Sequence, residues 1–192
     1  MSDPAVYVML LIAAITPGPN NVIVLRAATT GGLARALPGI AGIVLGGLAM
    51  LVVVAVGLGG VLAGRPELLR VLAIAGGGYL TWLGLASVRR AGAIANPAGA
   101  GLRSLTALAL FGFQFVNPKA WVILATAVTA APGSLAALAL AFAVISTASL
   151  LAWAALGALF ARVLARPRIA CWVDRALGAL LALSGVALIG GM

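Results

Sequence analysis

The chain has 192 residues, of which 64% are hydrophobic and only 8% are charged, and its mean hydropathy is +1.23. A water-soluble domain of this size would need a much larger share of polar residues at its surface, so the composition excludes an ordinary soluble protein and predicts a polytopic membrane protein. The 12 basic residues outnumber the 3 acidic ones, and we interpret this excess as basic loops that orient a membrane protein rather than as a surface that binds nucleic acid.

Six apolar segments are long enough to cross a bilayer, which takes about 20 residues of helix. They cover residues 5–25, 38–63, 67–88, 105–129, 134–160 and 176–190. The connections are too short to hold a soluble domain, so we predict one transmembrane domain over residues 1–192. The first segment has no Lys or Arg before it, unlike a signal peptide, and we expect it to be retained as the first span. A count of five spans is the alternative.

Positive charge is concentrated at alternate connections. The first, third and fifth connections carry Arg26 and Arg35, then Arg89, Arg90 and Arg103, then Arg162, Arg166, Arg168 and Arg175. With six spans these three connections share one side of the membrane, and the positive-inside rule makes that side cytoplasmic. Both termini are then expected to face outward.

Three prolines lie inside apolar segments rather than at their ends: Pro17 and Pro19 in the first segment, and Pro118 in the fourth. A proline in a helix removes a backbone donor and frees the carbonyl four residues earlier. Such a break is tolerated in a membrane only where the backbone is buried in protein or lines a wet cavity. Freed carbonyls are expected at Ala13, Ile15 and Gln114, and the amides of Asn20, Asn21, Gln114 and Asn117 are placed to satisfy the backbone or to bind a ligand.

The breaks at Pro19 and Pro118 occupy corresponding places in the first and fourth segments. Each half of the chain then holds an odd number of spans, so the two halves run in opposite directions. We therefore predict an all-α membrane protein of six transmembrane helices, arranged as two inverted three-helix repeats with helices 1 and 4 broken. The repeats cover about residues 1–90 and 104–192, with 91–103 as the connection. Interrupted helices at matching positions indicate a transporter's binding site, although a packed proline kink would explain either break alone.

Lys119 lies deep in the fourth segment, too far from either membrane surface for its side chain to reach water easily. An unpaired charge there costs at least about 2.5–3.5 kcal/mol, and no Asp or Glu lies inside a predicted span. A substrate carboxylate would be a natural partner, and the N–H groups that start a half-helix after Pro118 also favour an anion. With freed carbonyls for an ammonium group, the segment predicts a site for a zwitterion such as an amino acid. Alternatively, Lys119 bonds to freed carbonyls and only holds the break together.

Two further residues have open roles. Asp174 opens the sixth predicted span, and we expect it either to cap that helix or to serve as a gate or proton carrier. Tyr79 either lines a pathway or packs beside the glycines of the third span. With one Cys and no His, the sequence predicts no metal site, no cofactor and no enzyme active site. A homodimer is left open.

The chain resembles the LysE/RhtB family of bacterial amino-acid exporters, nearly from end to end. The resemblance rests on "TPGPNN", "GGLARALPGIAGIVLG", "GGGYLTWLG", "FQFVNPKAW" and "WVDRALGALLALSGVAL", in this order along the chain. It implies a small multi-pass protein of the bacterial inner membrane that exports an amino acid or a close derivative, driven by the proton motive force. It also implies functional roles for Pro17, Gly18, Pro19, Asn20, Asn117, Pro118 and Lys119.

The resemblance leaves the identity of the amino acid open. Related transporters with this plan move metal ions, so a metal-cation permease is the alternative function. A cation site would favour carboxylates over a lone lysine. We therefore expect export of a small zwitterion by alternating access.

Overall fold

The structure is a computed structural model that describes residues 4–58, 65–89, 106–130 and 134–190. Every element in this part of the chain is helical. The α-helices are α1 (Pro4–Ile15), α2 (Pro19–Val53), α4 (Pro66–Arg89), α5 (Ala107–Val116), α6 (Pro118–Ala130), α7 (Leu135–Leu159), α8 (Ala161–Leu164) and α9 (Pro167–Gly190), and a π-helical turn, η1 (Val54–Leu58), continues α2. The all-α class predicted from the sequence is confirmed.

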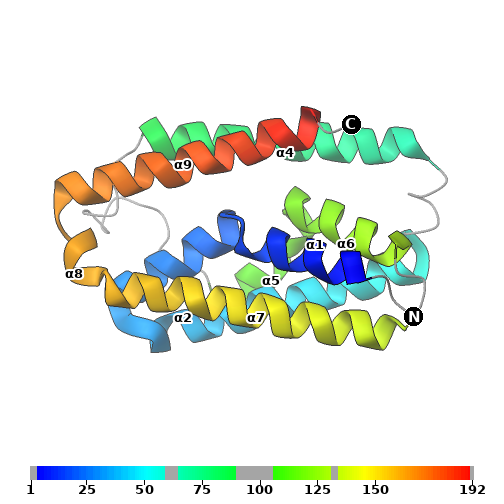
Figure 1. Cartoon of the computed structure of the whole chain (residues 1–192), viewed down its shortest axis with the longest axis horizontal. Helices are drawn as coiled ribbons and strands as arrows, with labels where there is room; N and C mark the ends of the chain where they lie inside the picture. The colour runs from blue at the N-terminus through cyan, green and yellow to red at the C-terminus, as the bar shows by residue number, and fades with distance from the viewer. Residues whose placement is uncertain (1–3, 59–64, 90–105, 131–133, 191–192) are drawn as a thin grey trace.

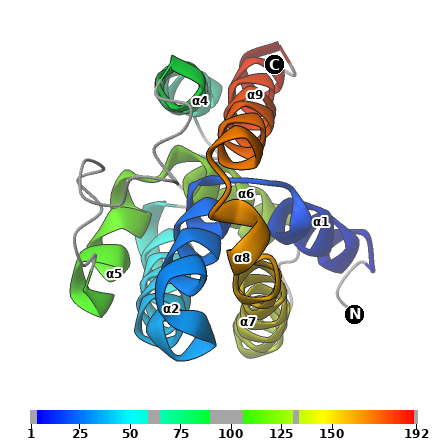
Figure 2. The same cartoon turned by 90° about the vertical axis from the view of Figure 1, so that its left-hand side faces the viewer.

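The helices form two layers (Figures 1 and 2). One layer is the pair α4 and α9, which lie side by side along one face of the molecule. The other is a bundle in which α2 packs along α7, with α5 beside α2, and α1 and α6 on the side nearer the pair. Contacts between α4 and α6 join the layers. Helix α1 begins and α9 ends at the same end of the molecule (Figure 1).

Glycines let α4 and α9 approach each other closely. A Cβ atom on Gly77 would collide with the carbonyl oxygen of Gly185, and one on Gly84 would collide with that of Gly178. Close backbone approach through small residues is how helices associate where no hydrophobic effect drives them together. The glycine-rich third segment therefore serves packing within this pair.

The structure corrects the predicted boundary between the first two segments. Helix α2 continues from Pro19 through the expected connection, and its backbone departs from helical geometry only at Gly31 and Gly32. Gly32 has a φ of +68°, a left-handed conformation that glycine adopts without steric cost. Pro38, predicted to begin the second span, lies inside α2 instead. The glycine pair makes the bend, and the flanking Ala, Leu and Arg residues favour helix on either side.

The sixth segment also starts earlier than predicted. Helix α9 begins at Pro167 rather than near residue 176, because proline at a first helical position loses no hydrogen bond. Asp174 therefore lies inside the helix, and its predicted role as an N-terminal cap is wrong. Asp174 is buried and lies within the candidate span Pro167–Ala187, so the expectation that no Asp or Glu lies inside a span is also wrong.

The number of spans is only partly tested. By length and composition, three stretches of the described residues could cross a membrane: Gly31–Gly57, Leu135–Leu159 and Pro167–Ala187. Two bent pairs bring the number to five if each is one span: Pro4–Ile15 with Pro19–Thr29, and Ala107–Phe115 with Lys119–Ala130. Helix α4 coincides with the third predicted span but lies outside this count. Six spans and inverted repeats therefore stay predictions.

Candidate functional site

The first break separates α1 from α2 at Thr16, Pro17 and Gly18. Neither Pro17 nor Pro19 has a backbone N–H, so two helical hydrogen bonds are lost within three residues, which favours a break here. The helices on the two sides are bent by 46° relative to each other. The break is therefore where the prolines predict it.

The second break separates α5 from α6 at Asn117, and the helices on its two sides are bent by 64°. The backbone N–H of Asn117 donates to the carbonyl of Gln114 at 3.1 Å, so the carbonyl expected to be freed by Pro118 is satisfied within the turn. The Asn117 carbonyl accepts from the N–H groups of Ala120 and Trp121 at 3.1 and 3.3 Å and starts α6. The side chain of Pro118 lies outside those described.

Side chains satisfy the carbonyls exposed at the first break. Asn21 Nδ2 donates to the carbonyls of Ala14 and Thr16, at 3.0 and 3.1 Å. Ser149 Oγ donates to the Ala14 carbonyl at 2.8 Å, and Lys119 Nζ to the Thr16 carbonyl at 2.9 Å. The prolines predict freed carbonyls at Ala13 and Ile15, and that prediction stays a prediction. The side-chain bonds go to the neighbouring carbonyls of Ala14 and Thr16, at the end of α1.

Lys119 thus connects the two breaks. Its side chain starts on α6, and its ammonium group bonds to the backbone at the end of α1. A Cβ atom on Gly18 would lie 3.2 Å from Nζ, so the glycine leaves room for the lysine. Lys119 therefore bonds to a carbonyl at a break, as the structural alternative predicted. Its ammonium group also lies at the edge of a cavity.

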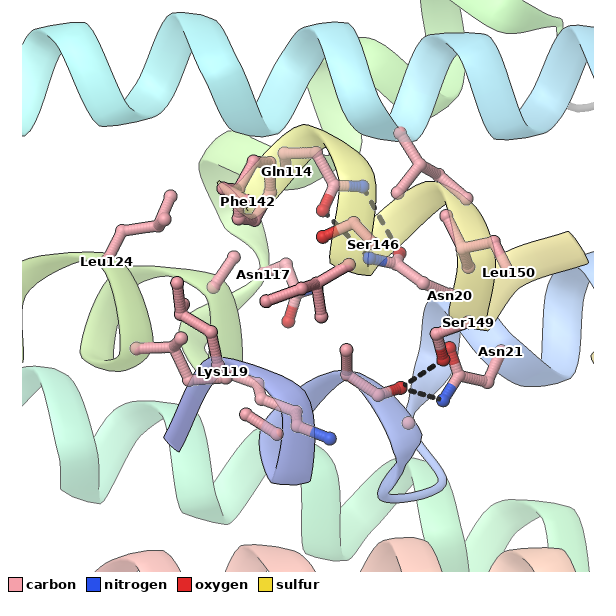
Figure 3. Close-up of a pocket in the computed structure, with 18 of the residues that line it drawn as sticks. Asn20, Asn21, Gln114, Asn117, Lys119, Leu124, Phe142, Ser146, Ser149 and Leu150 are labelled. Carbon is pink, nitrogen blue, oxygen red and sulfur yellow. Dashed lines mark hydrogen bonds between the residues drawn. The ribbon is translucent and has the colours of Figure 1, made fainter. Parts of the chain in front are cut away.

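A second link between the breaks is the amide pair of Asn20 and Gln114. Asn20 Nδ2 donates to Gln114 Oε1 at 2.9 Å, and Gln114 Nε2 donates back to Asn20 Oδ1 at 3.2 Å (Figure 3). Gln114 Nε2 also donates to the Leu110 carbonyl at 3.0 Å. These bonds hold residues that are far apart in the sequence on one side of the cavity.

The cavity among α1, α2, α5, α6 and α7 has a volume of about 90 Å³. Polar side chains from both breaks face apolar ones across it (Figure 3). Its lining residues are Leu10, Ala13, Ala14, Gly18, Pro19, Asn20, Asn21, Ile43, Gln114, Asn117, Lys119, Ala120, Ile123, Leu124, Phe142, Ile145, Ser146, Ser149 and Leu150. Asn117 is 2% exposed, and its Oδ1 has no hydrogen-bond partner among the described residues. Such an acceptor is available to a donor on a bound molecule.

Most of the predicted site residues meet at this cavity. Those lining it are Gly18, Pro19, Asn20, Asn21, Gln114, Asn117 and Lys119, whereas Pro17 is not among them. Sequence reasoning missed Ser146 and Ser149 of α7, as well as Phe142. An isolated serine in an apolar helix is common, so only the packing of α7 against the two breaks reveals these three.

The two residues with open roles lie elsewhere. Asp174 is fully buried in α9, where its Oδ1 accepts a hydrogen bond from Arg26 Nη2 at 2.6 Å. Neither Arg26 nor Asp174 lines the cavity. Tyr79 belongs to α4, and its side chain is outside those described. The predicted roles of Asp174 and Tyr79 in gating or proton coupling stay predictions.

Broken apolar helices whose ends bring polar side chains to one cavity are typical of a class, the membrane transporters with discontinuous helices. The family model of the LysE type translocator matches residues 11–191, so the chain belongs to that family. The members of this family are inner-membrane transporters, not enzymes.

Curated relatives support the same assignment. The chain is 31% identical over 160 residues to the cysteine/O-acetylserine efflux protein of Klebsiella pneumoniae subsp. pneumoniae, covering 80% of each chain. It is 30% identical over 167 residues to proteins of the same name from Salmonella choleraesuis and Salmonella typhimurium, covering 82% of this chain and 83% of each relative. No solved structure matches the chain.

Proposed function

We propose that this LysE-family protein exports a small amino acid or derivative across the bacterial inner membrane, by alternating access driven by the proton motive force. The observation that carries the proposal is the cavity between the two breaks, with an ammonium group and an unpaired amide oxygen at its edge. The substrate carboxylate binds the Lys119 ammonium group near the starts of α2 and α6, where the helix dipole favours an anion. The substrate ammonium binds Asn117 Oδ1, with Asn20 and Asn21 beside it.

The cavity volume favours a small substrate. About 90 Å³ is less than the roughly 150 Å³ of an engineered cavity that binds benzene. An aromatic or long-chain amino acid would therefore need the cavity to enlarge. The serine hydroxyls on α7 suit a short polar side chain. The relatives' names, which specify efflux of cysteine and O-acetylserine, support a solute of this kind for the present chain as well.

The arrangement of the helices supports a pair of inverted repeats. The broken helices α1/α2 and α5/α6 occupy equivalent places in the two halves. The most extensive packing joins α2 to α7 and α4 to α9. The part of α2 after Gly32 corresponds to α7 in the proposed halves, and α4 corresponds to α9. Rocking of one half against the other would open the cavity to each side in turn. The basic connections would face the cytoplasm and both termini the periplasm. A homodimer is compatible with this scheme and is not required by it.

Transport of a metal cation is the alternative function. The nearest charged group at the cavity is Lys119, which would repel a cation. Within the described residues, no cluster of three or more His, Cys, Asp or Glu side chains could hold a metal ion. The amino-acid assignment is therefore better supported by the chemistry of the cavity.

The proposal is tested by uptake of labelled small amino acids into inverted membrane vesicles whose interior is made acidic. We expect uptake that depends on the pH gradient, and Lys119→Ala to slow it at least about 10-fold, since a hydrogen bond to a charged group contributes about 1.5–3 kcal/mol. Arg168→Ala removes a positive charge from an exposed residue of α9 and should transport normally. Uptake by Lys119→Ala at the wild-type rate would refute the carboxylate contact. Uptake of divalent cations but not amino acids would favour the alternative.

A further inference from the structure

The ion pair between Arg26 and Asp174 is a buried charged contact between the two layers. Arg26 belongs to α2 in the bundle and Asp174 to α9 in the outer pair, and Nη2 lies 2.6 Å from Oδ1. The side chain of Asp174 is 1% exposed and that of Arg26 is 21% exposed. Among the described helices, α9 packs extensively on α4 alone, has a small contact with the adjoining α8, and touches α2 only slightly. The ion pair is therefore a main attachment of α9 to the broken helix.

The energetics of this pair are poorly suited to a permanent attachment. Taking two charges out of water costs several kcal/mol per ion, and apolar side chains of similar size often link buried surfaces with equal or greater stability. The guanidinium of Arg26 is also incompletely satisfied, because its Nε is buried without a hydrogen-bond partner among the described residues. Charged partners can be stabilised by water when they separate. A contact of this kind suits two surfaces that must part and rejoin.

The position of the pair relates it to the cavity. Arg26 follows Asn20, which lines the cavity, by six residues, or about 9 Å along the helix. The helix leads from the cavity toward the end of the molecule where α8 lies and α9 starts (Figure 1). This is the end with the basic residues Arg162, Arg166 and Arg168, which we propose to be cytoplasmic. The pair thus stands between the cavity and that end.

The section of α2 that carries Arg26 is bounded by a non-helical segment on each side. Before it lies the proline break, and after it Gly31 and Gly32 have φ values of −148° and +68°. Changes in direction at these two places require no loss of hydrogen bonds within the section itself. Segments with such ends can move as short rigid units, and hinges are often a few residues at the ends of elements.

We propose that the Arg26–Asp174 ion pair is a cytoplasmic gate. The pair is closed in this structure, and it opens in each transport cycle so that α9 and the hinged section of α2 separate and admit solute to the cavity. When it opens, Arg26, whose side chain is already 21% exposed, becomes hydrated on the cytoplasmic side. The gate rests on the proposed alternating access, but it concerns entry to the cavity and not the identity of the solute.

Side-specific labelling of the cavity tests the gate. In a Cys171→Ala background, Ser146→Cys places one thiol on the cavity wall, and a membrane-impermeant maleimide is applied to inverted or right-side-out vesicles. We expect Asp174→Asn and Arg26→Gln each to speed labelling several-fold from the cytoplasmic side alone. Arg175→Gln removes a neighbouring charge from α9, where the guanidinium lies over Trp172, and is expected to leave the rate unchanged.

Three outcomes separate a gate from a structural contact. An unchanged rate in both charge-removing variants would overturn the proposal, and so would an equal increase from both sides, which would indicate a loosened fold. The exchanged pair, Arg26→Asp with Asp174→Arg, is expected to slow labelling again, and a rate as fast as in the single variants would count against the gate. Because labelling needs no transported solute, it remains informative even if the chain proves not to export amino acids.

Discussion

Lys119 and Asn117 flank the start of α6, yet their polar groups are satisfied to different degrees. The ammonium group of Lys119 bonds to the Thr16 carbonyl, so the empty site already satisfies part of its charge. Asn117 Oδ1 is buried and lacks a partner among the described residues. A buried acceptor without a donor costs about 1–3 kcal/mol. A bound ammonium group would remove that cost, so binding would complete the hydrogen bonding of Asn117.

Asn117→Ala should therefore weaken substrate binding without destabilising the empty protein through a lost hydrogen bond. Loss of a bond to a charged group implies an increase in KM of about 10- to 100-fold. Transport kinetics in vesicles and thermal unfolding of the purified protein measure the two effects. A large fall in the stability of the empty protein, with KM unchanged, would show that Asn117 has only a structural role.

At the residue level, the site residues that can be predicted from the sequence are those that are unusual in an apolar segment. Prolines and a lysine inside a predicted span are costly, so their presence alone indicates a special environment. Ser146 and Ser149 carry no such signal, because a serine can satisfy its hydroxyl within its own helix. Their place at the cavity depends on how α7 packs against two distant breaks, and a single sequence does not encode that distance in any readable pattern.

At the level of elements, breaks are more predictable than ends. Both breaks lie beside the prolines that predict them, because these prolines have no backbone N–H to donate. The start of α9 is harder to locate from residue type, because Pro167 looks equally suited to a loop and to the first turn of a helix. Residue type is equally ambiguous in α2. The bend lies at Gly31 and Gly32, whereas Pro38 lies within the helix after the bend.

Packing of α4 against α9 gives a prediction with a matched control. Gly84→Ala would place a methyl group against the backbone of Gly178 and Ala182, whereas Gly78→Ala meets no atom within 4 Å. Overpacking of a tight contact costs about 1–3 kcal/mol, so Gly84→Ala should lower the Tm and Gly78→Ala should not. Thermal unfolding in detergent compares them. Equal Tm values would contradict the close packing of the pair.

For the whole molecule, one arrangement accounts for the cavity and for the two layers. Broken helices in the bundle supply polar backbone and side-chain groups at the cavity, and α9 in the outer pair is joined to one of them by the Arg26–Asp174 ion pair. Movement between the layers would therefore change access to the site without altering the groups that bind the solute. Membership of the LysE type translocator family agrees with transport as the function of this arrangement.

The central claim is that the cavity binds a small solute by both its carboxylate and its ammonium group. Thermal unfolding of the purified protein first identifies, from a panel of small amino acids, the one that raises the Tm most. Two analogues of that amino acid are then compared with it. The amide analogue lacks the carboxylate, and the 2-hydroxy acid analogue lacks the ammonium group, while both have nearly the size of the amino acid. At about 100 times its Kd the amino acid should stabilise the protein by about 2.7 kcal/mol, and both analogues should have little effect at the same concentration. Equal stabilisation by either analogue would contradict the claim.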